Sequence, residues 1–151
     1  MTDLNTTRTA LPRANPGALA GWMPYGLAAL RIVSGLLFIE HGTQKLFGFP
    51  APPAHGLSPL LSLTGIAACL EIGGGLLLVL GLRTRLVAFI LSGEMAIAYF
   101  MVHAPHSFFP ILNGGDAAIL FCFVFLFFAF SGSGPLSADA LLERRKPTNP
   151  R

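Results

Sequence analysis

Charged residues are scarce in this sequence: they make up 11% of its 151 residues, whereas hydrophobic residues make up 53%. A soluble globular domain carries about 25% charged residues. The mean hydropathy of +0.65 agrees with this deficit. The composition excludes an ordinary soluble domain and indicates an integral membrane protein.

The signatures of several common protein classes are also missing. The sequence contains no Walker loop, no Gly-x-Gly-x-x-Gly and no Gly-x-Ser-x-Gly, so nothing in it points to a nucleotide site or a serine hydrolase. A di-metal site in a helical bundle needs two Glu-x-x-His motifs; none is present, and no metal is expected. The two cysteines, Cys69 and Cys122, stand alone in apolar runs. This favours small buried residues over a redox pair, although the sequence leaves open whether the two thiols meet.

Four apolar stretches are present, separated by loops rich in proline and glycine or by a short polar turn. An isolated strand cannot satisfy its backbone in lipid, so each stretch is expected to be helical. The predicted fold is an all-α membrane protein, a four-transmembrane-helix bundle with spans at about 24–47, 60–82, 86–102 and 116–130. These spans form a membrane domain over residues 23–142, between a flexible tail (1–22) and a basic tail (143–151). A short amphipathic helix capped by Ser137 is expected over residues 137–145.

The basic residues predict the orientation of the chain. Eight of the ten lysines and arginines fall on one side of the predicted spans, in the two tails and in the middle turn. The positive-inside rule then places both termini in the cytoplasm. A nucleic-acid-binding protein would need these charges on one folded face, so nucleic acid is not an expected partner. The eight residues are Arg8, Arg13, Arg83, Arg85, Arg144, Arg145, Lys146 and Arg151.

Each predicted span contains one acidic residue, a distribution unlike that of solvated surface charge. A charged side chain at mid-bilayer costs about 2.5–3.5 kcal/mol on insertion scales. We therefore expect these carboxyl groups to face the bundle interior, to pair with cations or to be protonated. Arg31 and Lys45 are the expected cations, together with His41 and His103. The four acids are Glu40, Glu71, Glu94 and Asp116.

The first span presents two polar faces. One face carries Arg31 and Lys45 at helical spacing with Gly35, Phe38 and Gly42, whereas Glu40 and Gln44 lie on the other side. Two neighbours, or one neighbour and a second protomer, are needed to cover both faces. On the second span a small residue recurs at every fourth position, which predicts close approach of another helix. These small residues are Gly65, Cys69 and Gly73.

These features together resemble the DoxX family of small four-span membrane proteins. The resemblance runs from about Tyr25 to Leu142. Asp116 stands where the family usually has Glu, and Ser133 and Ala138 also depart from its pattern. The resemblance implies a bacterial inner-membrane protein. It also implies a link to redox chemistry, since the family is named after the membrane subunit of a thiosulfate:quinone oxidoreductase and other members are tied to redox and oxidative-stress complexes. The matching segments are Arg31, Gly35, 41–42, 45–48, Glu71, 74–75, 81–85, 113–116 and 132–139.

Three interpretations of the intramembrane carboxyl groups compete: structural ion pairs, a redox or quinone site, and a proton or solute path. Our hypothesis is a membrane subunit of a redox complex, at most one subunit of a quinone-linked oxidoreductase; the alternatives are a non-catalytic anchor or assembly protein and a small transporter. Expected partners are the lipid bilayer, a redox partner and a second copy of the chain. Quinone is the candidate cofactor, but no binding motif assigns residues to it. The candidate site residues are Arg31, Glu40, His41, Lys45, Glu71, Glu94 and Asp116.

Overall fold

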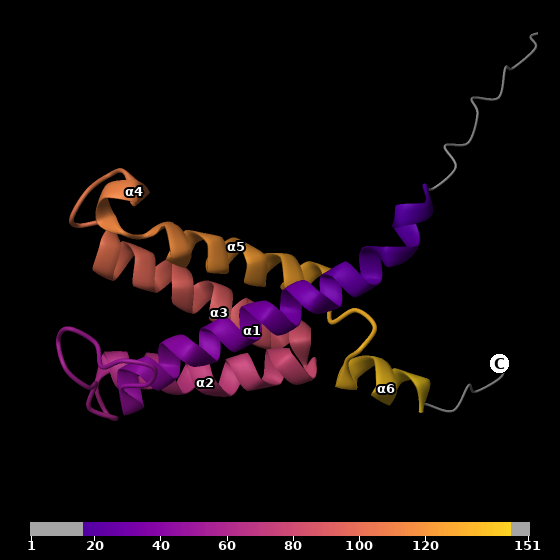
Figure 1. Cartoon of the computed structure of the whole chain (residues 1–151), viewed down its shortest axis with the longest axis horizontal. Helices are drawn as coiled ribbons and strands as arrows, with labels where there is room; N and C mark the ends of the chain where they lie inside the picture. The colour runs from indigo at the N-terminus through magenta and orange to yellow at the C-terminus, as the bar shows by residue number, and fades with distance from the viewer. Residues whose placement is uncertain (1–16, 146–151) are drawn as a thin grey trace, which may run out of the picture.

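The computed structural model describes residues 17–145 and is entirely helical over that range, without a strand (Figure 1). The all-α prediction is therefore confirmed for this part of the chain. The predicted tail residues 1–16 and the basic residues 146–151 lie outside the described residues. The elements are η1 (Ala18–Trp22), α1 (Met23–Phe47), α2 (Leu63–Leu80), α3 (Thr84–Ala98), η2 (Tyr99–His103), α4 (Pro110–Asn113), α5 (Asp116–Ser131) and α6 (Ala138–Arg144).

Local sequence signals explain where the helices begin and end. A proline lies in the first turn of α1, and Gly48 ends that helix with a φ of 68°. Ser62 caps α2 by accepting a hydrogen bond from the N–H of Gly65 at 3.1 Å, so α2 starts later than the predicted residue 60. Gly81 ends α2 in the left-handed region. In the second loop, which was predicted to be irregular, residues 110–113 form the single helical turn α4.

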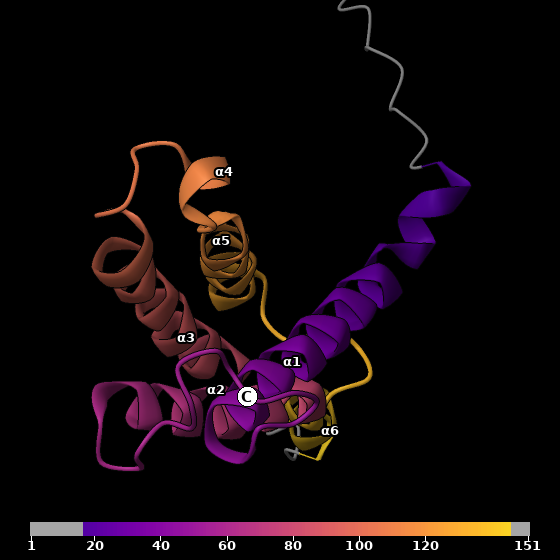
Figure 2. The same ribbon diagram turned by 60° about the vertical axis from the view of Figure 1, so that its left-hand side comes forward.

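The four long helices form two antiparallel pairs. Helix α1 packs mainly against α2, and α3 mainly against α5, while the pairs meet chiefly through α2 and α3 (Figures 1 and 2). The α1–α2 contact is close because Gly35 and Gly75 face each other: a Cβ atom on Gly35 would lie 2.9 Å from the Gly75 carbonyl oxygen. Two glycines thus set the distance between these helices.

The predicted small-residue stripe on the second helix is wrong. Cys69 is exposed, a Cβ atom at Gly73 would meet nothing within 4 Å, and Gly65 packs only on the preceding loop. The face that meets α1 instead carries Ala68 and Gly75, which are offset from that stripe by about one residue on the helical wheel. The expected burial of Cys69 fails for the same reason.

The hydrophobic core lies where the two pairs meet. Phe38 of α1 contacts Phe125 of α5 edge to face, with ring centroids 4.8 Å apart, and Leu78 and Leu91 join the same cluster. Phe125 and Phe128 are fully buried, while other rings of α5 such as Phe123 are exposed. The α5 phenylalanines therefore divide between a buried face and an exposed face.

Three helical segments are long and apolar enough to cross a membrane: Leu19–Phe47, Leu63–Leu80 and Thr84–His103. The segment Asp116–Ser131 is apolar but only 16 residues long. The two ends of the described chain lie at the same end of the molecule as the turn between α2 and α3 (Figure 1). We call this the inner end; the loop after α1 and helix α4 lie at the opposite, outer end.

Candidate functional site

An ion pair joins the first two helices in the outer half of the molecule. The Nζ atom of Lys45, in the last turn of α1, donates a hydrogen bond to Oε1 of Glu71, in the middle of α2. The Glu71 side chain is 2% exposed and that of Lys45 is 33% exposed. Gly42 makes the contact possible, because a Cβ atom there would lie 3.1 Å from the Glu71 Cβ and 2.7 Å from the Ala68 carbonyl oxygen.

Glu94 of α3 completes a cluster that we call the carboxylate–lysine cluster: Lys45, Glu71 and Glu94. The Glu94 carboxyl group interacts electrostatically with Glu71 and Lys45. Both Glu94 oxygens and Oε2 of Glu71 are buried without a hydrogen-bond partner among residues 17–145. At 1.5 Å per residue, Glu71 lies roughly 12 Å from the start of α2 and Glu94 roughly 15 Å from the start of the helical segment Thr84–His103, so each is near the middle of its segment.

The charges of this cluster do not balance. With both carboxyl groups ionised, two negative charges face the single positive charge of Lys45, so the cluster carries a net charge of −1. One proton, held by either acid, makes it neutral. A buried group with unsatisfied oxygens is costly unless it is protonated or bound to a further donor. The arrangement is therefore suited to taking up and releasing one proton.

A groove opens beside the cluster, between α1 and α5. It has a volume of about 340 Å³ and is lined by Leu37, Glu40, His41, Gln44, Pro50 and Phe121. The imidazole of His41 contacts Phe121 edge to face, with centroids 5.8 Å apart. His41 lies one helical turn before Lys45 on α1, so the groove adjoins the carboxylate–lysine cluster.

Two predicted acids do not face the interior of this chain. Glu40 and Asp116 are both exposed within this chain and form no ion pair among residues 17–145. Of the expected outcomes, protonation or cover by a second protomer stays a prediction for these two. Glu40 lies on the groove side of α1, opposite the α2 contact, and Asp116 starts α5 at the outer end. His103, another expected cation, contacts the carbonyl oxygen of Asn113 at 3.0 Å instead of a carboxylate.

Arg31 is fully buried at the inner end. It forms no ion pair with an acid of the spans among residues 17–145, and the carboxylate that interacts with it electrostatically is that of Asp139. The Nη1 atom of Arg31 donates to the carbonyl oxygens of Leu78 and, at 2.8 Å, of Val79, which belong to the last turn of α2. Its Nε and Nη2 donate to the carbonyl oxygens of Ser133 at 2.9 Å and Leu136 at 2.8 Å. The last carbonyls of a helix have no partner within it, and a cation there also favours the helix dipole. Arg31 thus caps α2 and ties the segment after α5 to α1.

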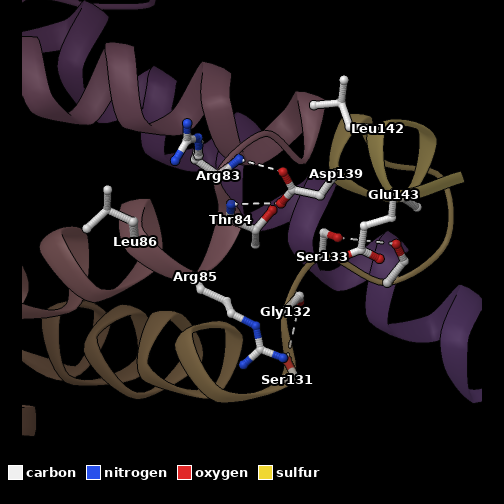
Figure 3. Close-up of a pocket in the computed structure, with 12 residues that line it drawn as sticks. Arg83, Thr84, Arg85, Leu86, Ser131, Gly132, Ser133, Asp139, Leu142 and Glu143 are labelled. Atoms are coloured by element: carbon white, nitrogen blue, oxygen red, sulfur yellow. Dashed lines mark hydrogen bonds between the residues drawn. The ribbon is translucent and has the colours of Figure 1, made fainter. Parts of the chain in front are cut away.

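Asp139 of α6 performs the complementary task for α3. Its carboxylate accepts hydrogen bonds from the backbone N–H groups of Arg83 at 2.8 Å and Thr84 at 3.0 Å (Figure 3). Burial alone would raise the pKa of Asp139, but these N–H bonds outweigh it and hold the pKa below its usual value. The expected cap on α6 is confirmed, because the Ser137 hydroxyl accepts from the Ala140 N–H at 3.1 Å. Asp139 was missed as a site residue, although an acid in the first turn of a helix was visible in the sequence.

These observations define a small all-helical protein with three helices able to cross a membrane and a charged cluster buried between them. The sequence matches the DoxX family model over residues 26–104, and the chain belongs to the DoxX family. It is also 47% identical over 128 residues to an "Uncharacterized protein" of Haemophilus influenzae (strain ATCC 51907 / DSM 11121 / KW20 / Rd), an alignment that covers 80% of this chain and 93% of the relative. No solved structure matches the chain. The cluster and Arg31 lie inside the family match, whereas the resembling segments near residues 113 and 132 lie beyond it.

Proposed function

We propose that this DoxX protein is a four-span protein of the bacterial inner membrane that serves as the membrane subunit of a quinone-linked redox complex. The observation that carries the proposal is the carboxylate–lysine cluster, buried near mid-helix beside a groove with polar and aromatic walls. Both termini are assigned to the cytoplasm, because basic residues gather in the tails and in the turn at the inner end.

Helix α5 is assigned as the fourth span. Its 16 residues extend about 24 Å, somewhat less than the roughly 30 Å of a bilayer core. It packs along α3 and exposes apolar rings such as Phe123 and Phe130, so a water-facing position would leave these rings solvated. A short span of this kind is accommodated by local thinning of the bilayer.

The groove and the cluster have complementary chemistry for a quinone substrate. Reduction of a quinone to a quinol takes up two electrons and two protons. His41 and Gln44 offer hydrogen-bond donors for a quinone oxygen, and Phe121 offers a ring face for stacking. The carboxylate–lysine cluster, which lies next to this groove, passes the two protons one at a time and is reprotonated from water after each transfer, and a redox partner supplies the two electrons.

The proposal is tested by analysing the small molecules that stay bound to the gently solubilised protein. We expect native mass spectrometry and extraction to find close to one quinone per chain in the wild type. His41→Ala should reduce this amount, since it removes the ring that contacts Phe121, while Cys69→Ala on the exposed side of α2 should leave it unchanged. A chain that retains only phospholipid would refute the quinone assignment.

A second experiment tests the cluster itself. Membranes containing the protein and its electron donor should form quinol, and Glu94→Gln should abolish this reaction while expression and bound quinone stay at wild-type levels. Glutamine keeps the size of the side chain and removes the exchangeable proton. If Glu94→Gln instead prevents the protein from accumulating, the carboxyl group is a packing device and the anchor or assembly function is favoured.

A proton path is the second candidate function, and Glu94 favours it, because neither of its oxygens has a partner within the described chain. A path of this kind needs no redox partner. Proteoliposomes containing only this chain should then show proton flux that Glu94→Gln abolishes. Flux without bound quinone would support the path, and bound quinone without flux would support the redox subunit.

A further inference from the structure

A second and larger groove lies at the inner end, between α6 and the ends of α3 and α5 (Figure 3). Its volume is about 860 Å³. Neither the proposed quinone chemistry nor the carboxylate–lysine cluster uses it. Its walls include Arg85 and Leu86 of α3, Gly132 after α5, and Leu142 and Glu143 of α6.

Arg85 is the cation on the α3 wall of this inner groove. Its Nη1 donates to the carbonyl oxygens of Phe130 and, at 3.3 Å, of Ala129, which fixes the guanidinium against the end of α5. Its Nε and Nη2 have no hydrogen-bond partner among residues 17–145, so three N–H donors remain available. They lie beside Gly132, where a Cβ atom would come within 3.3 Å of Nη2. The guanidinium is thus held in place with donors to spare.

Glu143 is the anion on the opposite, α6 wall. It is exposed and forms no ion pair within the described residues, where the only salt bridge joins Lys45 and Glu71. The other acid of the groove, Asp139, is already bound to the backbone N–H groups of Arg83 and Thr84. Arg83 also lines the groove, and its guanidinium forms no hydrogen bond or ion pair among residues 17–145. The groove therefore presents two cations, Arg83 and Arg85, and one free anion, Glu143, which form no ion pair with each other.

Apolar side chains border these charges. Leu86 is 58% exposed and Leu142 is 52% exposed, and both line the groove. Further along α3, Phe89 continues this apolar surface toward the middle of the molecule. A ligand that fits this wall carries an anion, a cation and an apolar part.

We propose that the inner groove binds the headgroup of phosphatidylethanolamine, with the phosphate on Arg85, the ammonium on Glu143 and an acyl chain along Leu86. An ammonium donates hydrogen bonds to a carboxylate, which the trimethylammonium of phosphatidylcholine cannot do. Phosphatidylglycerol has no cationic group to pair with Glu143, so its binding would place the Glu143 carboxylate beside an anionic lipid without a partner. The inference rests on the membrane placement given under the proposed function, but not on the quinone chemistry.

The test measures which lipids remain on the protein. Full-length protein is placed in nanodiscs of equal parts phosphatidylethanolamine, phosphatidylglycerol and phosphatidylcholine, released into detergent, and analysed by native mass spectrometry. We expect wild type to retain phosphatidylethanolamine above its share of the mixture. Glu143→Gln should lose the preference over phosphatidylglycerol, and Arg85→Gln should weaken retention of both lipids about tenfold, the effect of one charge-assisted hydrogen bond. Arg144→Gln, which removes a charge from α6 outside the groove, is the matched control.

Glu143→Gln is the decisive variant, because the Glu143 side chain forms no hydrogen bond or ion pair within residues 17–145 that its replacement could break. Retention of all three lipids in equal amounts by wild type, or an unchanged preference in Glu143→Gln, would overturn the proposal. Water-soluble glycerophosphoethanolamine is added as a competitor: displacement of the lipid at low concentration would show that the headgroup alone is the ligand and would overturn the role of Leu86. A chain that fails to enter nanodiscs at all would instead refute the membrane placement.

Discussion

Replacing Lys45 with methionine should destabilise the protein more than any neutral change at Glu71. The Glu71 carboxylate is 2% exposed, and Lys45 is its single hydrogen-bond partner within residues 17–145. Removing one member of a fully buried ion pair costs about 3–5 kcal/mol. Because the Lys45 side chain is 33% exposed, solvent screens part of that attraction, and we expect a loss of about 2–3 kcal/mol.

The reverse change has a smaller expected cost. In Glu71→Gln the amide oxygen still accepts from Lys45, and the partly exposed ammonium can reach water or headgroups, so the loss should be about 1 kcal/mol. In the double variant Lys45→Met with Glu71→Leu, the ion pair is replaced by apolar side chains, and Glu94, the one acid left in the cluster, is neutral when it holds a proton, so stability should return close to wild type.

The assay is reversible unfolding in mixed micelles, followed by circular dichroism at increasing SDS, with Leu61→Ala in the exposed loop as the control. Lys45→Met, Glu71→Leu and their double variant form the double-mutant cycle that isolates the pair interaction, and Glu71→Gln is measured beside them. A double variant as unstable as Lys45→Met, or a Glu71→Gln loss equal to that of Lys45→Met, would refute the reasoning that an uncompensated buried carboxylate is the cause.

Three further predictions concern packing and the inner end. Gly35→Ala should lower the free energy of unfolding by about 1–3 kcal/mol, because the new Cβ would lie 2.9 Å from a backbone oxygen of α2. Gly73→Ala, which has open space around it, should raise that free energy by up to about 1 kcal/mol. SDS titration measures both changes. Arg31→Lys should be strongly destabilising although it keeps the charge, since one ammonium cannot replace donors that reach four carbonyl groups, and trypsin should then cut the segment after α5 faster. The stability advantage of wild type over Asp139→Ala should be complete above the ordinary carboxyl pKa and should vanish as the pH falls through the lowered pKa of the folded state; an advantage that grows on acidification would contradict it.

The positions of the helices and the role of Lys45 as the cation of an ion pair could be predicted from the sequence, because their causes are local. Apolar runs between proline and glycine signals predict where α1, α2, α3 and α5 lie, and the spacing of Arg31, Phe38 and Gly42 predicts the buried face of α1. Lys45 could be matched to an acid since few cations are available in the spans. The orientation of the spans and the fourth crossing stay predictions.

The sequence predictions failed where the partner of a side chain lies far away in the sequence or is a backbone group. Arg31 binds carbonyl oxygens that lie 47 to 105 residues away, and any residue type supplies a carbonyl, so no sequence pattern reveals such partners. A stripe of small residues was placed on the wrong face of α2 because several overlapping stripes exist there, and only packing selects Gly75 over Gly73. Glu40 lies on the face of α1 that was expected to need a second neighbour or a second protomer, and this face borders the groove between α1 and α5.

The bonds at the inner end join the parts of the chain that are synthesised first and last. Arg31 needs the carbonyl groups of Ser133 and Leu136, and the first turn of α3 needs Asp139. While the ribosome is still making α5, Arg31 is a buried cation with half of its acceptors missing, and α3 lacks its cap. The inner end can therefore close only after translation has passed residue 139. We expect a nascent chain that stops at residue 131 to be degraded by membrane proteases at several times the rate of one that reaches residue 145, as a pulse–chase measurement would show.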